Sequence, residues 1–277
     1  MYSDNSTPTM KTTESHTVCL QDADIRVDIH DYLALTRMTY RFINDQDANI
    51  EAVYTFTLPI DGVLTDLRVQ IGEREMHGVA VEKSQAQEEY EQAVCEGDSP
   101  IMLERLDLGL YCLNIGNILP GELAKVTVEF MEILCLKADE VRYELPTTLA
   151  PLYENPSSRG LEPHQYPTSN LFADNRCNIE IVVNGCLTNA DISTPSHSTV
   201  LTIKNGRAKL TFSEPAASMD RDFILIFRSE VLSRAFAISA PDKDRFVVLA
   251  AFTPEIRTVD PAKSIKIVVD CSGSMAG

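Results

Sequence analysis

Three side chains with oxygen atoms occupy alternate positions near the end of the sequence. Asp270, Ser272 and Ser274 follow the strand-like run IKIVV at 265–269. A carboxylate and two hydroxyls are hard oxygen ligands, which suit Mg²⁺, Ca²⁺ or Mn²⁺. Mg²⁺ requires near-octahedral coordination, so these three side chains need further ligands from elsewhere. The alternative interpretation is a simple turn after a strand, because Asp, Ser and Gly are common turn residues.

Other residue types that carry chemistry are scattered along the chain. Ser274 has Ser272 and Ala276 two places to either side, so it does not form the G-x-S-x-G turn of a serine nucleophile. The odd number of cysteines, without a C-x-x-C pair, predicts free thiols rather than a zinc site or a disulfide framework. The five histidines lie in polar or turn segments and are interpreted as surface or capping residues. The cysteines are Cys19, Cys95, Cys112, Cys135, Cys177, Cys186 and Cys271, and the histidines are His16, His30, His77, His164 and His197. We therefore expect no enzyme.

Charge and length limit the class of protein. The formal net charge of -17 repels phosphate backbones and anionic lipids, so we expect neither nucleic acid nor membrane as a partner. No apolar run approaches the roughly 20 residues that span a bilayer. The N-terminal residues lack the basic-then-apolar order of a secretory signal, which favours a cytoplasmic location. A chain of 277 residues has room for about two domains.

Alternating apolar residues predict strands through most of the first half. The alternation begins at Ile25, and it returns in EAVYTFTLP at 51–59. The segments VLTDLRVQIGE at 63–73 and MHGVAVE at 76–82 are interpreted as a hairpin joined around Gly72–Glu75. Pro120 and Gly121 in NILPGE predict a type II turn between two further strands.

One segment has helical spacing instead. Ala86, Tyr90, Ala93 and Val94 form an apolar stripe at i, i+4, i+7 and i+8, and Gly97 can adopt the left-handed conformation that ends a helix. We interpret Ser84 and Gln87 as a capping box at its start. So short a helix needs a sheet to pack on, and we expect Tyr90 to share a core with Phe56. The acidic residues of the helix, Glu88, Glu89 and Glu91, predict a solvated face, with an acidic docking surface as the rarer alternative.

Proline-rich sequence separates a second region rich in predicted strands. Prolines spread through 145–170 indicate a connection. Five short apolar runs then follow between Asn178 and Phe252, and their near-regular spacing favours a sandwich or half-sandwich. These runs are NIEIVVN, STVLTIKN, RAKLTFS, DFILIFRS and RFVVLAAFTP.

Three motifs in order resemble a known domain family. The stretches EAVYTFTLP, AQEEYEQAVCEG and LDLGLYCLNIGNILPGELAKVTVEF resemble the vault protein inter-alpha-trypsin (VIT) domain, and the resemblance covers 25–145. In that family a von Willebrand factor type A domain commonly follows. The terminal IKIVVDCSGSM resembles the first strand of a type A domain and its metal-ion-dependent adhesion site (MIDAS), D-x-S-x-S.

The resemblance implies a fold and a domain order. The fold is mainly β: a VIT β-sandwich-like domain with one amphipathic helix, a second β-rich region, and the orphan first strand of an α/β type A domain. The expected divisions are a disordered tail at 1–18, the VIT domain at 19–145, a Pro-rich connection at 146–176, the second β-rich region at 177–255, and the start of the type A domain at 256–277.

The resemblance also implies a function. In the family, a threonine and an aspartate from later loops complete the metal site, so the chain is expected to be a fragment cut just inside its type A domain. We expect Mg²⁺, or Ca²⁺ or Mn²⁺, at Asp270, Ser272 and Ser274 in the full-length protein, and no bound metal in this fragment. The expected function is a non-enzymatic protein-interaction module with an unidentified protein partner. The alternatives are a purely structural scaffold or the non-catalytic part of a multidomain enzyme. The terminal strand, Ile265–Val269, is apolar enough to favour self-association.

Overall fold

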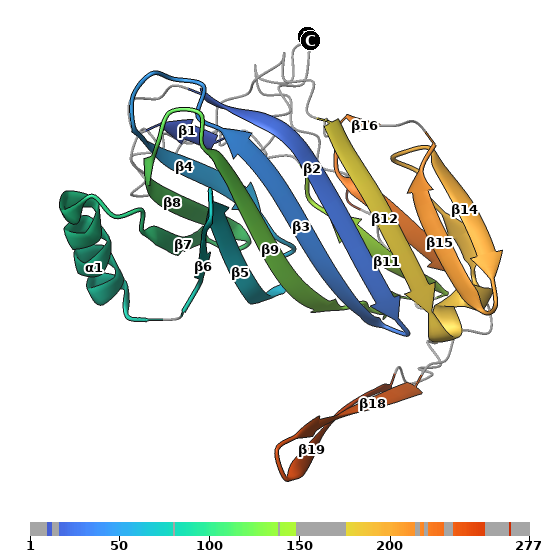
Figure 1. The fold of residues 1–277 in the computed structure, drawn as a ribbon. Coiled ribbons are helices and arrows are strands. Elements are labelled where there is room, and N and C mark those ends of the chain that lie inside the picture. The colour runs from blue at the N-terminus through green and yellow to red at the C-terminus, as the bar shows by residue number, and fades with distance from the viewer. Residues whose placement is uncertain are drawn as a thin grey trace. The chain divides into compact units, whose positions relative to one another are not determined.

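The computed structural model describes residues 10–12, 17–79, 81–137, 139–147, 176–213, 217–218, 221–229, 235–252 and 266. These residues fall into two units. One unit is Asp4–Leu232, and the other is Ser233–Gly277 together with Met1–Ser3. Figure 1 shows the strands of both, and each unit is described separately.

The centre of the first unit is a large, mainly antiparallel sheet. Five of its strands lie in the order β6 (Arg74–His77), β5 (Val63–Ile71), β9 (Leu123–Ile133), β3 (Leu33–Ile43) and β2 (Thr17–His30). Strands β3 and β9 pair along their whole length, from Leu33 opposite Ile133 to Ile43 opposite Leu123. Alternate residues of β3 are buried, as expected for a strand with one face on a core.

Strand β2 belongs to two branches of the sheet. Its first residues pair with β1 (Met10–Thr12), and from there the sheet continues through β4 (Ile50–Thr57), β8 (Leu110–Ile118) and β7 (Ile101–Asp107). Its later residues pair in parallel with β12 (Arg176–Asn184). Beyond β12 lie β15 (Arg207–Phe212), β14 (Thr199–Lys204) and the short β16 (Ala217–Ser218). The part of the expected tail that forms β1 is therefore a strand and not a disordered segment.

A separate four-stranded sheet completes the unit. Its order is β10 (Leu136–Lys137), β11 (Glu140–Leu145), β17 (Phe223–Arg228) and β13 (Asp191–Ser193), and a short 3-10 helix, η3 (Gly185–Asn189), precedes β13. The strands expected between 178 and 252 all form, but they divide among the large sheet, this sheet and a hairpin of the second unit.

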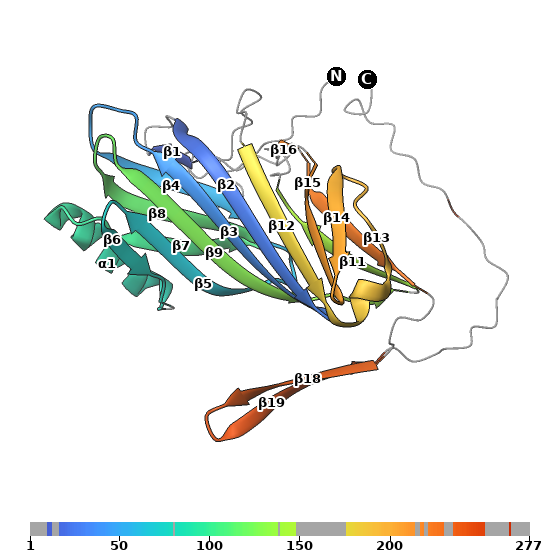
Figure 2. The ribbon, with the colours of Figure 1, turned by 45° about the vertical axis from the view of Figure 1, so that its right-hand side comes forward.

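The large sheet folds over, so that β4, β8 and β7 lie behind β3 and β9, and the core lies between these two parts of the sheet and between the sheet and β11 (Figure 2). The rings of Tyr40 on β3 and Tyr54 on β4 have centroids 5.2 Å apart, and Tyr54 stacks on Phe56 at 5.2 Å. Further along β3, the hydroxyls of Thr36 and Tyr143 are 2.9 Å apart and join the large sheet to β11. The inner face of β3 is therefore covered by β4 along one part of its length and by β11 along another.

Helix α1 (Lys83–Glu96) is the one α-helix among the described residues, so the expected mainly β fold with a single helix is confirmed. The capping box is wrong, because the N-cap is Glu82 and it makes no side-chain cap bond. Gly97 ends the helix with φ 88°, and its N–H donates to the carbonyl oxygen of Val94 at 3.1 Å. This left-handed cap is as the sequence predicts.

Tyr90 anchors the helix, but not in the core that contains Phe56. Its hydroxyl donates to Oε1 of Glu51 at 2.9 Å, and its ring lies on the side of β8 that carries Cys112. Phe56 stacks instead on Tyr111, the neighbour of Cys112 along the strand, with ring centroids 5.7 Å apart. Successive side chains of a strand point to opposite faces. The expectation of a shared core is therefore wrong.

The described part of the second unit is a hairpin of β18 (Ala235–Asp242) and β19 (Arg245–Phe252). Most of its apolar side chains are exposed, including Phe246, Val247, Val248 and Phe252. Val247 points to the opposite face from its two neighbours. Apart from Lys266, the expected terminal strand lies outside the described residues, as does most of the Pro-rich connection.

Candidate functional site

The predicted metal ligands Asp270, Ser272 and Ser274 lie outside the described residues, so the structure places none of them. Within the described part of the chain, no group of three or more His, Cys, Asp or Glu side chains is arranged to hold a metal ion. The same residues include no helix with the length and apolar composition that a membrane span needs.

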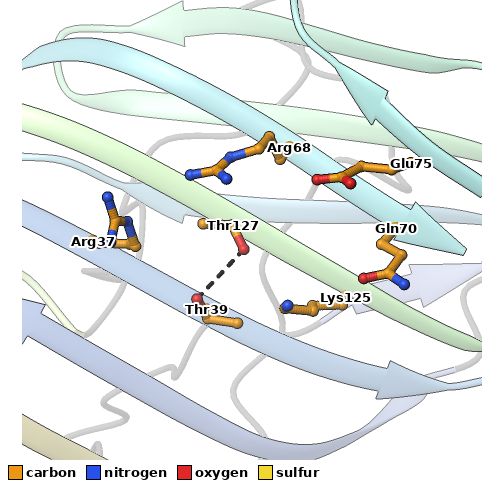
Figure 3. A pocket seen from close by; sticks show the side chains of 7 residues that line it. All are labelled: Arg37, Thr39, Arg68, Gln70, Glu75, Lys125 and Thr127. Atoms are coloured by element: carbon orange, nitrogen blue, oxygen red, sulfur yellow. Dashed lines mark hydrogen bonds between the residues drawn. The ribbon is translucent and has the colours of Figure 1, made fainter.

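A hollow on the outer face of the large sheet gathers charged and hydroxyl side chains. Its volume is about 170 Å³, and it lies over β3, β9, β5 and β6 (Figure 3). We call it the outer-face hollow. Its lining residues are Arg37, Thr39, Arg68, Gln70, Glu75, Lys125 and Thr127.

Strand register brings these residues together. Thr39 on β3 is opposite Thr127 on β9, and Thr127 is opposite Arg68 on β5. Two residues away on each strand, Lys125 on β9 is opposite Gln70 on β5. Directly paired residues on one face of a sheet have Cβ atoms about 4.5–5.5 Å apart. The polar residues of three strands therefore form one patch because the apolar residues between them point into the core.

Two of the three cationic side chains in the hollow already have a carboxylate beside them. Nε of Arg37 donates to Oε2 of Glu129 at 3.0 Å. Nε of Arg68 lies 2.7 Å from Oδ2 of Asp66, without the alignment of a hydrogen bond. Lys125 has no ion-pair partner among the described residues. Among the described residues, the hollow therefore contains one ammonium group without a carboxylate partner.

The floor of the hollow carries two hydroxyl groups. Oγ1 of Thr39 and Oγ1 of Thr127 are 3.4 Å apart, which is a long contact for a hydroxyl pair. Thr127 is 8% exposed, so its hydroxyl lies at the bottom of the hollow and not on a raised surface. Figure 3 shows the side chains of Arg37, Arg68 and Lys125 around this pair.

A second hollow of about 170 Å³ lies further across the same face, and Arg37 borders both. Its other lining residues carry both signs of charge among apolar side chains. They are Arg26, Val27, Asp28, Leu35, Glu180 and Val182. This second hollow contains no pair of hydroxyls and shows no excess of one charge.

The acidic side chains of α1 are largely engaged with the helix itself. Nε2 of Gln85 donates to Oε1 of Glu89 at 2.8 Å, and Nε2 of Gln87 donates to Oε1 of Glu91 at 3.3 Å. Both are i, i+4 contacts of the kind that support an exposed helix face. This arrangement matches the solvated face that the sequence predicts.

Five of the seven cysteines are described as free thiols, namely Cys95, Cys112, Cys135, Cys177 and Cys186. Burial raises the pKa of Cys112 to about 11 and that of Cys177 to about 12. A thiol in such a site stays protonated at neutral pH and is a poor nucleophile.

The first motifs of the chain match a known domain. Residues 20–130 match the vault protein inter-alpha-trypsin domain, VIT. The VIT domain runs from β2 through most of β9, so it contains every residue that lines the outer-face hollow. The hollow is thus part of the VIT domain itself.

Relatives extend the similarity beyond the VIT domain. The chain is 26% identical over 286 residues to von Willebrand factor A domain-containing protein 5A of Rattus norvegicus, covering 93% of this chain and 34% of that protein. A von Willebrand factor A domain-containing protein of Dictyostelium discoideum is 24% identical over 270 residues, covering 93% of this chain and 28% of that protein. The chain is therefore homologous to proteins that contain a type A domain, and it spans about a third of the length of protein 5A.

A relative that is named as an enzyme aligns over a similar share of this chain. Protein mono-ADP-ribosyltransferase PARP4 of Mus musculus is 21% identical over 272 residues, covering 94% of this chain and 14% of that protein. The start of a type A domain at 256–277 stays a prediction, because neither the domain match nor the described residues include it.

The residues of the outer-face hollow were not singled out from the sequence. Arg37, Arg68 and Lys125 are each ordinary outward residues of a strand, and they are widely separated along the chain. The sequence does show that Arg37, Arg68 and Lys125 each occupy a polar position in a segment where polar and apolar residues alternate. Their proximity depends on the order of β3, β9 and β5 in the sheet, which local patterns do not give.

Proposed function

We propose that this chain is part of a non-catalytic protein-interaction protein, in which the VIT domain supports a type A domain that binds a partner through a divalent cation. The observation that supports this is homology to von Willebrand factor A domain-containing proteins across 93% of the chain.

Asp270, Ser272 and Ser274 are the residues proposed to hold the cation. Their carboxylate and two hydroxyls match the hard-oxygen preference of Mg²⁺, and also that of Ca²⁺ or Mn²⁺. A cation held there would supply Lewis-acid chemistry towards an oxygen ligand of the partner, such as a carboxylate. The role of this chain is to present the three oxygen ligands directly after the apolar run at 265–269.

A second candidate function has its own support. The alignment with a protein mono-ADP-ribosyltransferase covers nearly the whole chain but only 14% of that protein. A sequence similar to this chain therefore also occurs as a small part of a protein that is named as an enzyme. On this alternative the present chain is a non-catalytic scaffold within a larger enzyme.

The metal-dependent proposal is tested by capture of binding partners with the intact protein. Wild type, Asp270→Ala and a control, Asp47→Ala, are each used with Mg²⁺ and with EDTA. Asp47 lies in an exposed loop of the VIT domain and is far from the motif in sequence. We expect a partner that is retained with Mg²⁺ by wild type and Asp47→Ala, and lost with EDTA and with Asp270→Ala. A partner retained equally in all conditions would contradict the metal-dependent mechanism and favour the scaffold.

A further inference from the structure

We propose that the outer-face hollow of the VIT domain binds the phosphoryl group of a phosphorylated serine or threonine in a partner protein. This site is independent of the cation motif, and it gives the VIT domain a contact of its own. The argument uses the position, charge, donor groups and size of the hollow.

Cationic side chains outnumber acidic ones in the lining of the hollow, against the trend of the chain. The chain has a formal net charge of -17, yet three of the seven lining residues of the hollow are cationic and only one is acidic. Arg37, Arg68 and Lys125 come from three neighbouring strands and surround the same floor (Figure 3). An anion approaching the rest of the molecule is repelled, so an anion that binds does so at a local feature such as this one.

Three carboxylates near the hollow moderate its attraction for anions. Glu75 lines it, Glu129 pairs with Arg37, and Asp66 lies beside Arg68. Because these three acids equal the three cations in number, binding depends on the placement of donor groups and not on net charge. We therefore expect modest affinity for free phosphate and added affinity from the peptide that carries the phosphoryl group.

The available donors outnumber the oxygens of a carboxylate. Lys125 offers an ammonium group, while Thr39 and Thr127 share only one long contact between their hydroxyls. Arg37 and Arg68 each keep guanidinium N–H groups beyond those that face Glu129 and Asp66. A phosphoryl group presents three strong acceptor oxygens and carries about −1.5 to −2 charge near pH 7. Three oxygens use this donor set more fully than the two of a carboxylate do.

The size of the hollow favours one functional group. At about 170 Å³ it is smaller than the ~300–1,000 Å³ pockets that enclose whole small molecules. Its walls are the side chains of a sheet face, with no second layer above them in the described residues. A phosphorylated side chain that projects from a peptide fits this shape, because the peptide can lie across the open side.

The test is a titration of the whole chain with inorganic phosphate at constant ionic strength, followed by NMR of the backbone amides. We expect saturable shifts at Thr39 and Thr127, with smaller and non-saturating changes when acetate replaces phosphate. Lys125→Gln should weaken phosphate binding about tenfold, which corresponds to loss of one charge-assisted hydrogen bond. The matched control is Lys209→Gln, because Lys209 on β15 is paired with Glu180 and does not line the hollow.

A second variant distinguishes a loss of phosphate binding from a folding defect. Thr127→Val keeps the shape of a β-branched residue but removes the hydroxyl at the floor, and it should also weaken phosphate binding while thermal unfolding stays cooperative. A phosphorylated peptide mixture should bind more tightly than phosphate, and its unphosphorylated form should not compete. The absence of saturable shifts at the two threonines, an equal response to acetate, or equal binding by Lys125→Gln and Lys209→Gln would overturn the proposal. None of these results bears on partner capture through Asp270.

Discussion

Glu132 on β9 is a buried carboxyl group, and we predict that its ionisation destabilises the fold. Its Oε1 is buried and has no hydrogen-bond partner among the described residues. Burial, assisted by the negative charges of Asp61 and Glu144, raises the pKa of Glu132 from 4.5 to about 7. Phe130, two residues earlier on the same strand, is fully buried. Residues two apart in a strand point to the same face, so the side chain of Glu132 points to the core side of the sheet.

The sign of the effect follows from the direction of this pKa change. Between about pH 4.5 and pH 7 the unfolded chain loses the proton of Glu132 while the folded chain keeps it, so stability falls as the pH rises. Below that window both states are protonated, and above it both are ionised. The pKa difference corresponds to at most ~3 kcal/mol at 1.36 kcal/mol per pKa unit. Residual exposure of the side chain lowers the expected cost to about 1–3 kcal/mol.

The perturbation is Glu132→Gln, which keeps the size of the side chain and removes its charge. Urea unfolding is followed by far-UV circular dichroism, because the chain contains no tryptophan. At pH 8 the variant should be more stable than wild type by about 1–3 kcal/mol, and at pH 4.5 the two should be nearly equal. The matched control is Glu129→Gln on the same strand, which removes the ion pair with Arg37 and should cost less than about 1 kcal/mol.

The reasoning is refuted if Glu132→Gln destabilises the chain at pH 8. It is also refuted if the difference between variant and wild type is the same at both pH values. Either result would mean that the carboxylate has favourable partners in solution.

Three further predictions concern packing and thiols. Tyr90→Phe should lower the free energy of unfolding in urea by about 0.5–1.5 kcal/mol, because the hydrogen bond to Glu51 is lost. Tyr90→Ala should lower it by about 3–5 kcal/mol. An unchanged unfolding midpoint for Tyr90→Ala would contradict the helix contact. Thr36→Val should lower the free energy of unfolding by about 1–3 kcal/mol, because the buried Tyr143 hydroxyl loses this partner. Adding Tyr143→Phe should recover part of that loss. No recovery would argue against the contact. Exposed thiols should react with a thiol reagent in the native chain and buried thiols only after denaturation, and reaction of all at one rate would contradict the placement. The exposed pair is Cys95 and Cys135, and the buried pair is Cys112 and Cys177.

Local features of the fold were predictable because short-range chemistry determines them. Gly121 has φ 75°, and the N–H of Glu122 donates to the carbonyl oxygen of Leu119 at 3.0 Å, as a Pro-Gly type II turn requires. The hairpin of β5 and β6 turns at Gly72, which has φ 57°, but its second strand is Arg74–His77 and not the segment 76–82 that the alternation indicated. In each case the turn needs a backbone conformation that glycine adopts without strain.

Features that depend on distant parts of the chain were not predictable. Strand β12 pairs in parallel with β2, placing Ile181 opposite Val27. The alternation of apolar residues in either segment predicts which face of the strand is buried, but not which strand lies beside it. The stripe of α1 gave the burial of Tyr90, but not the face of the sheet on which it packs. The outer-face hollow has the same dependence, because Lys125 and Thr39 become neighbours only through the pairing of β9 with β3.

The cation motif is the part of the account that the sequence predicts and the described residues do not include. Its donor chemistry follows from residue type alone, whereas its geometry depends on ligands contributed by distant segments. Homology to von Willebrand factor A domain-containing proteins makes it the first part to test.

The most direct measurement of the central claim is calorimetric titration of the intact protein with Mn²⁺, using wild type, Asp270→Ala and Asp47→Ala. Our proposal predicts one saturable cation site in wild type and Asp47→Ala that is lost in Asp270→Ala. It also predicts that the captured partner binds wild type only when this site is filled. A cation site that survives in Asp270→Ala, or a partner that binds equally well to the metal-free protein, would contradict it.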